Sequence, residues 1–242
     1  MGNNPVRYVD PSGNTYIIGW SYGKKDVREY EQYISKKGNA SISVDGSTDD
    51  WDDTIRDDFT KRSSFARAAY TRKKELLDMG VPESDIDVQR IDNEHDLEET
   101  WNMWAGYSII EGLDFYSHGY SGGAEVYGGS GDFWDDAQKL NWQSTLRELE
   151  IDGEKVGYIS SPYTVFYGCN TANGDFAQNY ADIQGVTTYA QTDYANFSHT
   201  RTYRTWIDTH GTSLDVYLLS FESLWNLWNG DGLGKKFIPS KC

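Results

Sequence analysis

The sequence predicts an α/β fold in which helices cover both faces of a mainly parallel central sheet. The first basis for this prediction is that short apolar runs of strand length alternate along the chain with amphipathic segments typical of helices. The second is the length of 242 residues, which is enough to bury one sizeable core. We therefore expect a short leader at residues 1–14 and one catalytic-size domain at residues 15–242.

Strands are predicted wherever a short apolar or alternating run is bounded by polar or turn-forming residues. These runs lie at residues 16–20, 86–91, 109–116, 163–167 and 186–191.

Helices are predicted between these runs. Ser63 or Ser64 is placed to cap a helix that continues to Met79, where Gly80 ends it. The other helical segments are 95–104, a segment containing Trp134, Leu140, Leu146 and Leu149, and 175–183.

A polar region lies at residues 24–60 and is strongly acidic from Asp45 to Asp58. Carboxylates suit calcium, but the spacing fits no known binding loop, so a solvated acidic segment is the favoured interpretation.

The formal net charge of −16 disfavours nucleic acid and anionic membranes as partners. No apolar run approaches the length needed to span a bilayer, and the N-terminus lacks a signal-peptide pattern. We expect a soluble chain without membrane insertion, whose export depends on something outside it.

The two cysteines, Cys169 and Cys242, do not form a disulfide framework. The histidines at 95, 118, 199 and 210 are far apart, and no Cys/His spacing resembles a zinc site. We therefore expect no metal and no cofactor. His95 is predicted to lie on the surface. Neither His199 nor His210 lies at the end of a predicted strand, so neither is favoured as a base.

His118 and Cys169 each follow a predicted central strand. If these strands are parallel neighbours, both side chains emerge at the carboxyl edge of the sheet, where ligands bind in open α/β sheets. A histidine that accepts the thiol proton makes cysteine a working nucleophile. The alternative is an inert buried cysteine beside an ordinary His-Gly turn.

Neighbouring residues have predicted roles in this site. Gly119 would let a peptide approach the backbone, and Gly168 would let the chain turn sharply. The backbone amides of Gly119 and Cys169 could form an oxyanion hole. Asp114 and Ser117 are candidates for orienting the histidine, or are plain sheet residues.

Aromatic residues are abundant and could suggest a surface that binds carbohydrate. Their helix-like spacing in the pairs Trp101/Trp104 and Trp225/Trp228 favours a core or sheet-covering role instead.

The leader NNPVRYVDPSG at residues 3–13 resembles the end of the core domain of Rhs/YD-repeat proteins, the shells of polymorphic toxins. In that family an acidic residue of this signature takes part in self-cleavage that frees a C-terminal effector. The resemblance implies that Asp10 is the counterpart of that residue, inert without the shell, and that the residues beyond 14 are the effector. It also implies delivery into a target cell and a cognate immunity protein, which the acidic charge suggests is basic.

The sequence order HGYSG at 118–122, YGCNTANG at 167–174 and AQTD at 190–193 resembles that of the caspase-like cysteine peptidases, such as clostripain, gingipains and CHAT domains. The resemblance spans about residues 14–222 and implies a caspase-like three-layer α/β/α sandwich. It further implies peptide-bond hydrolysis by a His118/Cys169 dyad without a metal. Asp193 could then line a substrate pocket that favours Lys or Arg.

The resulting hypothesis is a cysteine endopeptidase that acts on proteins of a rival cell as the tip of an Rhs toxin. One alternative is a non-catalytic binding module that keeps the fold, because the sequence offers no obvious third catalytic group. Another is a toxin of a different class, such as a nuclease or deaminase, against which the acidic charge and missing metal motif count.

Overall fold

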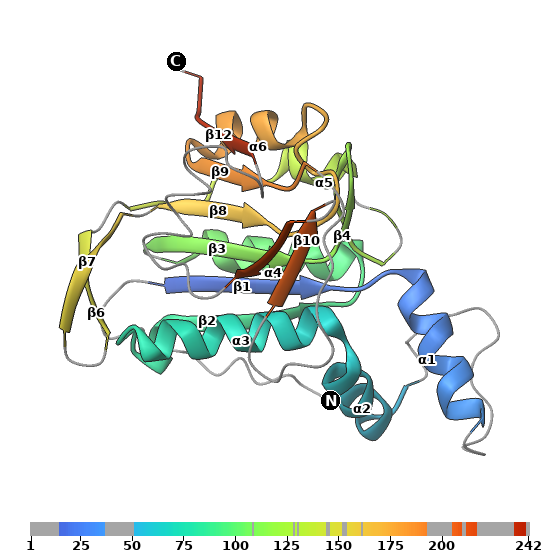
Figure 1. The fold of residues 1–242 in the computed structure, drawn as a ribbon. Coiled ribbons are helices and arrows are strands. Elements are labelled where there is room, and N and C mark those ends of the chain that lie inside the picture. Colours follow the sequence, from blue (N-terminus) through green and yellow to red (C-terminus); the bar gives the residue numbers. More distant parts are fainter. Residues whose placement is uncertain are drawn as a thin grey trace.

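The computed structural model describes residues 15–36, 51–107, 109–127, 129, 131–143, 146–151, 154–160, 162–192, 205–209, 212–216 and 235–240. Within these ranges the chain is mixed α/β with a mainly parallel central sheet and helices packed on it (Figure 1). The predicted fold class is confirmed to that level.

The central sheet has six strands in the order β12-β9-β8-β3-β1-β2. Its strands are β1 (Thr15–Ser21), β2 (Ile86–Ile91), β3 (Ile110–Tyr116), β8 (Tyr163–Phe166), β9 (Thr187–Ala190) and β12 (Lys235–Phe237). Neighbouring strands run parallel, except that β12 is antiparallel to β9. The predicted strands all appear near their expected bounds, whereas β12 was not predicted.

The helices lie on both faces and at one edge of this sheet (Figure 1). They are α1 (Lys24–Lys36), α2 (Asp53–Arg62), α3 (Ser64–Asp78), α4 (Glu94–Ala105), α5 (Gly131–Asp136) and α6 (Phe176–Gln184), with a short 3-10 turn η1 (Glu83–Asp85) before β2. The predicted helices at α3, α4 and α6 are confirmed. Ser63 caps α3 by accepting a hydrogen bond from the Ala66 amide, as its position in the sequence suggested.

Two hydrophobic cores lie on opposite faces of the sheet because side chains alternate along each strand. The first core includes side chains of α3, α1 and α2 with Ile18 and Trp20 of β1. The second core includes side chains of α4, α5 and α6 with Ile17 of β1. Trp101 and Trp104 are fully buried in the second core, which confirms their predicted role, whereas Trp225 and Trp228 lie outside the described residues.

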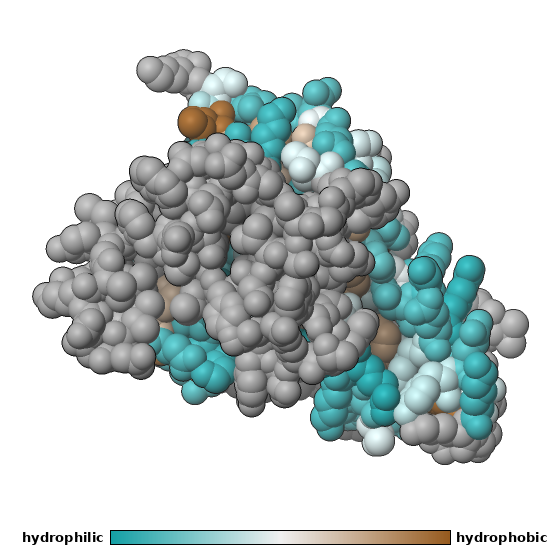
Figure 2. Space-filling model, viewed as in Figure 1, coloured by the Kyte–Doolittle hydropathy of each residue, from teal (hydrophilic) through white to brown (hydrophobic). Residues whose placement is uncertain are grey.

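The polar region at residues 24–60 contains two helices that the sequence analysis missed. In α1 the residues Val27, Tyr30 and Ile34 are buried, a helical spacing that sets one face against the first core. Asp52 caps α2, and Asp58 accepts hydrogen bonds from Tyr30 and Arg62. Of the acidic segment, Asp52 thus serves helix capping and Asp58 serves pairing, and the surface over α1 and α2 is mostly hydrophilic (Figure 2).

The predicted helix through Trp134 and Leu149 is wrong beyond residue 136. The backbone of 140–143 forms hydrogen bonds with the start of β3 and with the Gln184 side chain instead of continuing a helix. Leu149 belongs to a strand, β6 (Leu146–Ile151), which pairs with β7 (Glu154–Ser160). Trp134 and Leu140 are nevertheless buried in the second core as expected.

Two further hairpins were not predicted. The short strands β4 (His118–Tyr120) and β5 (Gly123–Glu125) form one of them at the carboxyl end of β3. The other hairpin consists of β10 (Thr205–Thr209) and β11 (Thr212–Val216). This hairpin crosses in front of the central strands in Figure 1.

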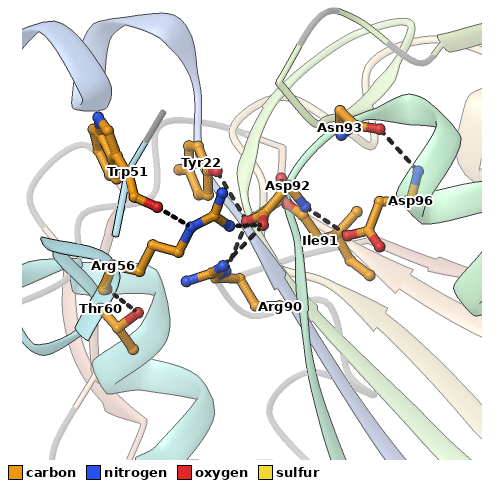
Figure 3. A network of polar contacts seen from close by, with 10 residues as sticks. Tyr22, Trp51, Arg56, Thr60, Arg90, Ile91, Asp92, Asn93 and Asp96 are labelled. Atoms are coloured by element: carbon orange, nitrogen blue, oxygen red, sulfur yellow. Dashed lines mark hydrogen bonds and ion pairs between the residues drawn. The ribbon is translucent and has the colours of Figure 1, made fainter. Parts of the chain in front are cut away.

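A polar network fixes the carboxyl ends of β1 and β2 to α2 (Figure 3). Its centre is the Asp92 carboxylate, which receives hydrogen bonds from the Tyr22 hydroxyl at 2.9 Å and from the guanidinium groups of Arg90 and Arg56. Arg56 also donates from Nε to the Trp51 carbonyl at 2.9 Å. Tyr22 lies directly before the turn that starts α1, so this network holds that turn against the sheet.

Candidate functional site

The strands that precede His118 and Cys169 are hydrogen-bonded parallel neighbours. Phe115 of β3 pairs with Phe166 of β8, and one residue further the Tyr167 amide donates to the Phe115 carbonyl at 2.9 Å. Both strands therefore end at the same edge of the sheet. This confirms the condition under which His118 and Cys169 were expected at one edge of the sheet, namely that β3 and β8 are parallel neighbours.

Glycine lets the two strand ends approach each other closely. A Cβ atom on Gly168 would lie 2.9 Å from the His118 carbonyl oxygen and 3.0 Å from Gly119 Cα. A Cβ on Gly119 would lie 2.8 Å from the Gly168 carbonyl carbon and 2.9 Å from the Cys169 carbonyl oxygen. The backbones of the His-Gly and Gly-Cys segments are thus in direct contact, and neither position has room for a side chain.

This contact gives both glycines a packing role in addition to the roles predicted for them. Gly119 faces the backbone of the cysteine loop, and Gly168 faces the His118 carbonyl. The left-handed residue of the cysteine loop is Asn170, with φ of 57°. Asn is among the residues that tolerate this conformation, so Asn170 continues the turn that begins with the bend at Gly168.

The loop that carries Cys169 is fixed by Thr171. The Thr171 hydroxyl donates to the Gly168 carbonyl at 2.9 Å and accepts from the Gln191 amide at 3.1 Å. The Ala172 amide donates to the Gln191 carbonyl at 2.8 Å. These bonds connect the cysteine loop to the end of β9, and the half-buried Cys169 thiol packs against the first core.

His118 is held by a carboxylate that the sequence analysis missed. Its Nε2 atom lies 2.8 Å from Asp26 Oδ2, in the first turn of α1. The same Asp26 oxygen accepts a hydrogen bond from the Gly23 amide at 2.8 Å. The Phe65 ring packs edge-on against the imidazole with centroids 4.8 Å apart.

The Asp26 contact fixes the tautomer of the imidazole. An ionised carboxylate only accepts hydrogen bonds, so Nε2 carries the proton that points at Asp26. Nδ1 is then the nitrogen that takes up a proton when the neutral imidazole becomes an imidazolium. A carboxylate that orients histidine in this way is a recurrent part of nucleophilic sites.

The pair also shifts the titration of both groups. Burial disfavours the charged form of His118, but the hydrogen bond and negative charge of Asp26, helped by Glu125, outweigh it and raise the pKa of His118. Burial likewise opposes ionisation of Asp26, yet His118 and the Gly23 amide lower the pKa of Asp26 below its ordinary value. The site thus favours an imidazolium beside a carboxylate.

The two residues suggested as orienting groups have other partners. Asp114 accepts hydrogen bonds from Arg72, Tyr163 and Tyr167 within the first core. The Ser117 hydroxyl donates to the His118 carbonyl at 2.6 Å and not to its ring. Asp26 could have been found from the sequence by noting an acidic residue three positions after Gly23, where it caps the helix that follows β1.

Other predicted residues are placed as follows. His95 is exposed and lies 3.3 Å from Glu99, as expected for a surface residue. Asp10, Asp193, His199, His210 and Cys242 lie outside the described residues. Among the described residues no group of His, Cys, Asp or Glu is arranged to hold a metal ion, and no helix is both long and apolar enough to cross a membrane.

Substituting Asp26→Asn should lower the pKa of His118, because the attraction of the carboxylate is lost while burial remains. The raised His118 pKa stabilises the fold below about pH 6.5, and this contribution is lost as pH rises through the folded pKa. The lowered Asp26 pKa stabilises it above about pH 4, and this is lost as pH falls through the folded pKa. The variant should therefore lose up to about 1 kcal/mol, mainly between these limits.

An NMR titration of the His118 ring protons measures the pKa, and urea unfolding across the same pH range measures the stability. The matched control is Asp53→Asn, in the first turn of α2 and exposed. It should leave the His118 titration unchanged. An unchanged titration in Asp26→Asn as well would show that the pair does not exist in solution.

Comparison of the chain with protein-family models, with curated proteins and with solved structures gives no match. The case for a function therefore depends on the geometry of the site and on the sequence motifs.

Proposed function

We propose that the chain is a cysteine endopeptidase in which Cys169 is the nucleophile, His118 the general base and Asp26 the residue that orients His118. The observation that carries this proposal is the junction of the β3 and β8 strand ends, where the histidine is hydrogen-bonded to Asp26 and the cysteine loop packs against the His-Gly backbone. The lack of an obvious third catalytic group had favoured a non-catalytic binding module. In this proposal Asp26 is that third group.

The reaction would follow the usual course of acyl transfer to a thiolate. His118 takes the Cys169 proton at Nδ1, and the thiolate sulfur forms a bond to the carbonyl carbon of the scissile peptide. The C–N bond breaks as the imidazolium gives its proton to the departing amine. Water, deprotonated by His118, then attacks the thioester and releases the carboxylate product and the thiol.

The backbone amides of Gly119 and Cys169 are the proposed donors to the oxyanion of the tetrahedral intermediate. They belong to the two segments that glycine brings into contact, so both are near the nucleophile. Asp193, two residues after Gln191, is proposed to favour Lys or Arg before the scissile bond. This substrate preference and the caspase-like three-layer fold both rest on the sequence resemblance.

We further propose that the peptidase is the effector of an Rhs-type toxin. Residues 1–14 would be the remnant of the shell junction, with Asp10 as its self-cleavage residue, and residues 15–242 the delivered domain. The substrate would be a protein of the target cell, and a basic immunity protein would protect the producer. No nucleic-acid partner or cofactor is part of this proposal.

The test is to incubate the protein with a bacterial lysate and identify new protein N-termini by mass spectrometry. The proposal expects a small set of new N-termini that share a residue before the cut and disappear after iodoacetamide treatment. A lysate without new N-termini, together with a protein retained on the chain in a pull-down, would favour the binding-module alternative.

A further inference from the structure

A buried ionic network lies on the first-core face, between α3 and the strands that lead to the site. The Arg72 guanidinium, only 3% exposed, donates from Nε to Asp114 Oδ2 at 2.8 Å and from Nη2 to the Tyr163 hydroxyl at 2.7 Å. Its third contact is from Nη1 to Glu75 Oε2 at 3.3 Å. Asp114, 1% exposed, is on β3, while Tyr163 begins β8.

Tyr167 connects this network to the candidate site. Its hydroxyl donates to Asp114 Oδ1 at 3.2 Å, and its ring stacks on Tyr116 with centroids 4.3 Å apart and planes 2° from parallel. Burial, and after it the charge of Asp114, hold the pKa of Tyr167 well above its ordinary value, so the phenol stays a neutral donor. Tyr116 precedes the Ser117-His118 segment, and Tyr167 precedes Gly168-Cys169.

The network is costly for a purely structural element. Removing an arginine and a carboxylate from water carries a large desolvation penalty, and well-packed apolar side chains in the same place are often as stabilising or more so. What a satisfied polar network adds is a single geometry, because each hydrogen bond restricts the orientation of its partners. Here the restricted elements are the last residues of β3 and β8.

We propose that the Arg72, Asp114 and Tyr167 side chains form a positioning unit that sets the end of β8 against the end of β3 and thereby places Cys169 relative to His118. This inference rests on the proposed function for its catalytic consequence. None of the three side chains takes part in the chemistry. They act through the backbone that carries the dyad.

The test compares Tyr167→Phe with Tyr180→Phe. Each variant removes one buried tyrosine hydroxyl that contacts a residue of the central sheet. The Tyr180 hydroxyl lies 3.4 Å from Thr164 Oγ1 on the second-core side of β8, so it is not part of the network. In both variants the free energy of unfolding is measured, together with two site readouts.

The first readout is hydrogen exchange of the residue-167 amide, which bonds to the Phe115 carbonyl at the junction of the strand ends. The second is the pH profile of Cys169 alkylation by iodoacetamide. Loss of one buried hydrogen bond should speed the residue-167 exchange about fivefold in Tyr167→Phe. The Cys169 profile should shift toward that of an ordinary thiol, and Tyr180→Phe should leave both readouts as in wild type.

Equal effects of the two variants would mean general destabilisation, and no effect of Tyr167→Phe would mean that the hydroxyl positions nothing. Either result overturns the inference. Failure of the proposed function would look different. Wild-type Cys169 would then alkylate like an ordinary thiol, while residue-167 exchange still decides whether the network holds the strand ends.

Discussion

Replacing Cys169 with alanine should abolish peptide-bond hydrolysis, lowering kcat by at least about a thousandfold. In the proposed mechanism the thiolate sulfur forms the acyl-enzyme, and a methyl group cannot replace it. Cys169 is half-buried at a loop after β8, so its loss should cost little stability. The proposed effector role predicts that expression of the wild-type chain inside a target cell is toxic and that expression of the variant is tolerated.

Hydrolysis is measured by release of new N-termini, and folding by circular dichroism and urea unfolding. The matched control is Cys242→Ala, which removes the other cysteine of the sequence and should leave activity as in wild type. Full activity of Cys169→Ala would eliminate the proposed mechanism. Loss of activity in both variants would point to a general requirement for thiols.

Replacing Gly168 with alanine should disable the proposed site without altering the side chain of His118 or Cys169. The new Cβ would lie 2.9 Å from the His118 carbonyl oxygen and 3.0 Å from Gly119 Cα, so backbone and not a flexible side chain must move. Overpacking of this kind costs about 1–3 kcal/mol. A displacement of about 1 Å between reacting groups reduces the rate about a hundredfold.

The variant Gly80→Ala serves as a control that separates the loss of stability from the displacement of the reacting groups. Gly80 has φ of +82° after α3 and nothing within 4 Å of its Cβ position, so alanine meets strain but no clash. The control should lose about 1–2 kcal/mol of stability and keep its activity. A Gly168→Ala variant that keeps wild-type kcat/KM would show that close backbone contact is not needed for catalysis.

Much of the sheet was predictable because its strands are apolar runs with clear boundaries. The strand ends also placed His118 and Cys169 at one edge, since parallel neighbours share a carboxyl end. The pairing of β3 with β8 joins residues far apart in the sequence, so the sequence analysis could only assume it. The structure contains this pairing.

Asp26 was missed because its helix lies in a polar region where apolar residues are sparse. Only Val27, Tyr30 and Ile34 mark the buried face of α1, and the aromatic contacts that hold it come from Trp51 and Phe59 in a later segment. The error after residue 136 has a similar origin. Leucines at helical spacing were counted, while the pairing of Trp142 with Ile110 is a tertiary contact without a local signal.

The central claim is that Cys169 is an activated thiol paired with a histidine. A brief iodoacetamide pulse at a series of pH values, followed by mass spectrometry that reports Cys169 and Cys242 separately, tests it most directly. The account predicts that Cys169 is labelled rapidly at pH values well below the ordinary thiol pKa of about 8.5, and that Cys242 is labelled slowly at the same pH values. Labelling of Cys169 that rises only near that value, or does not occur, would contradict it.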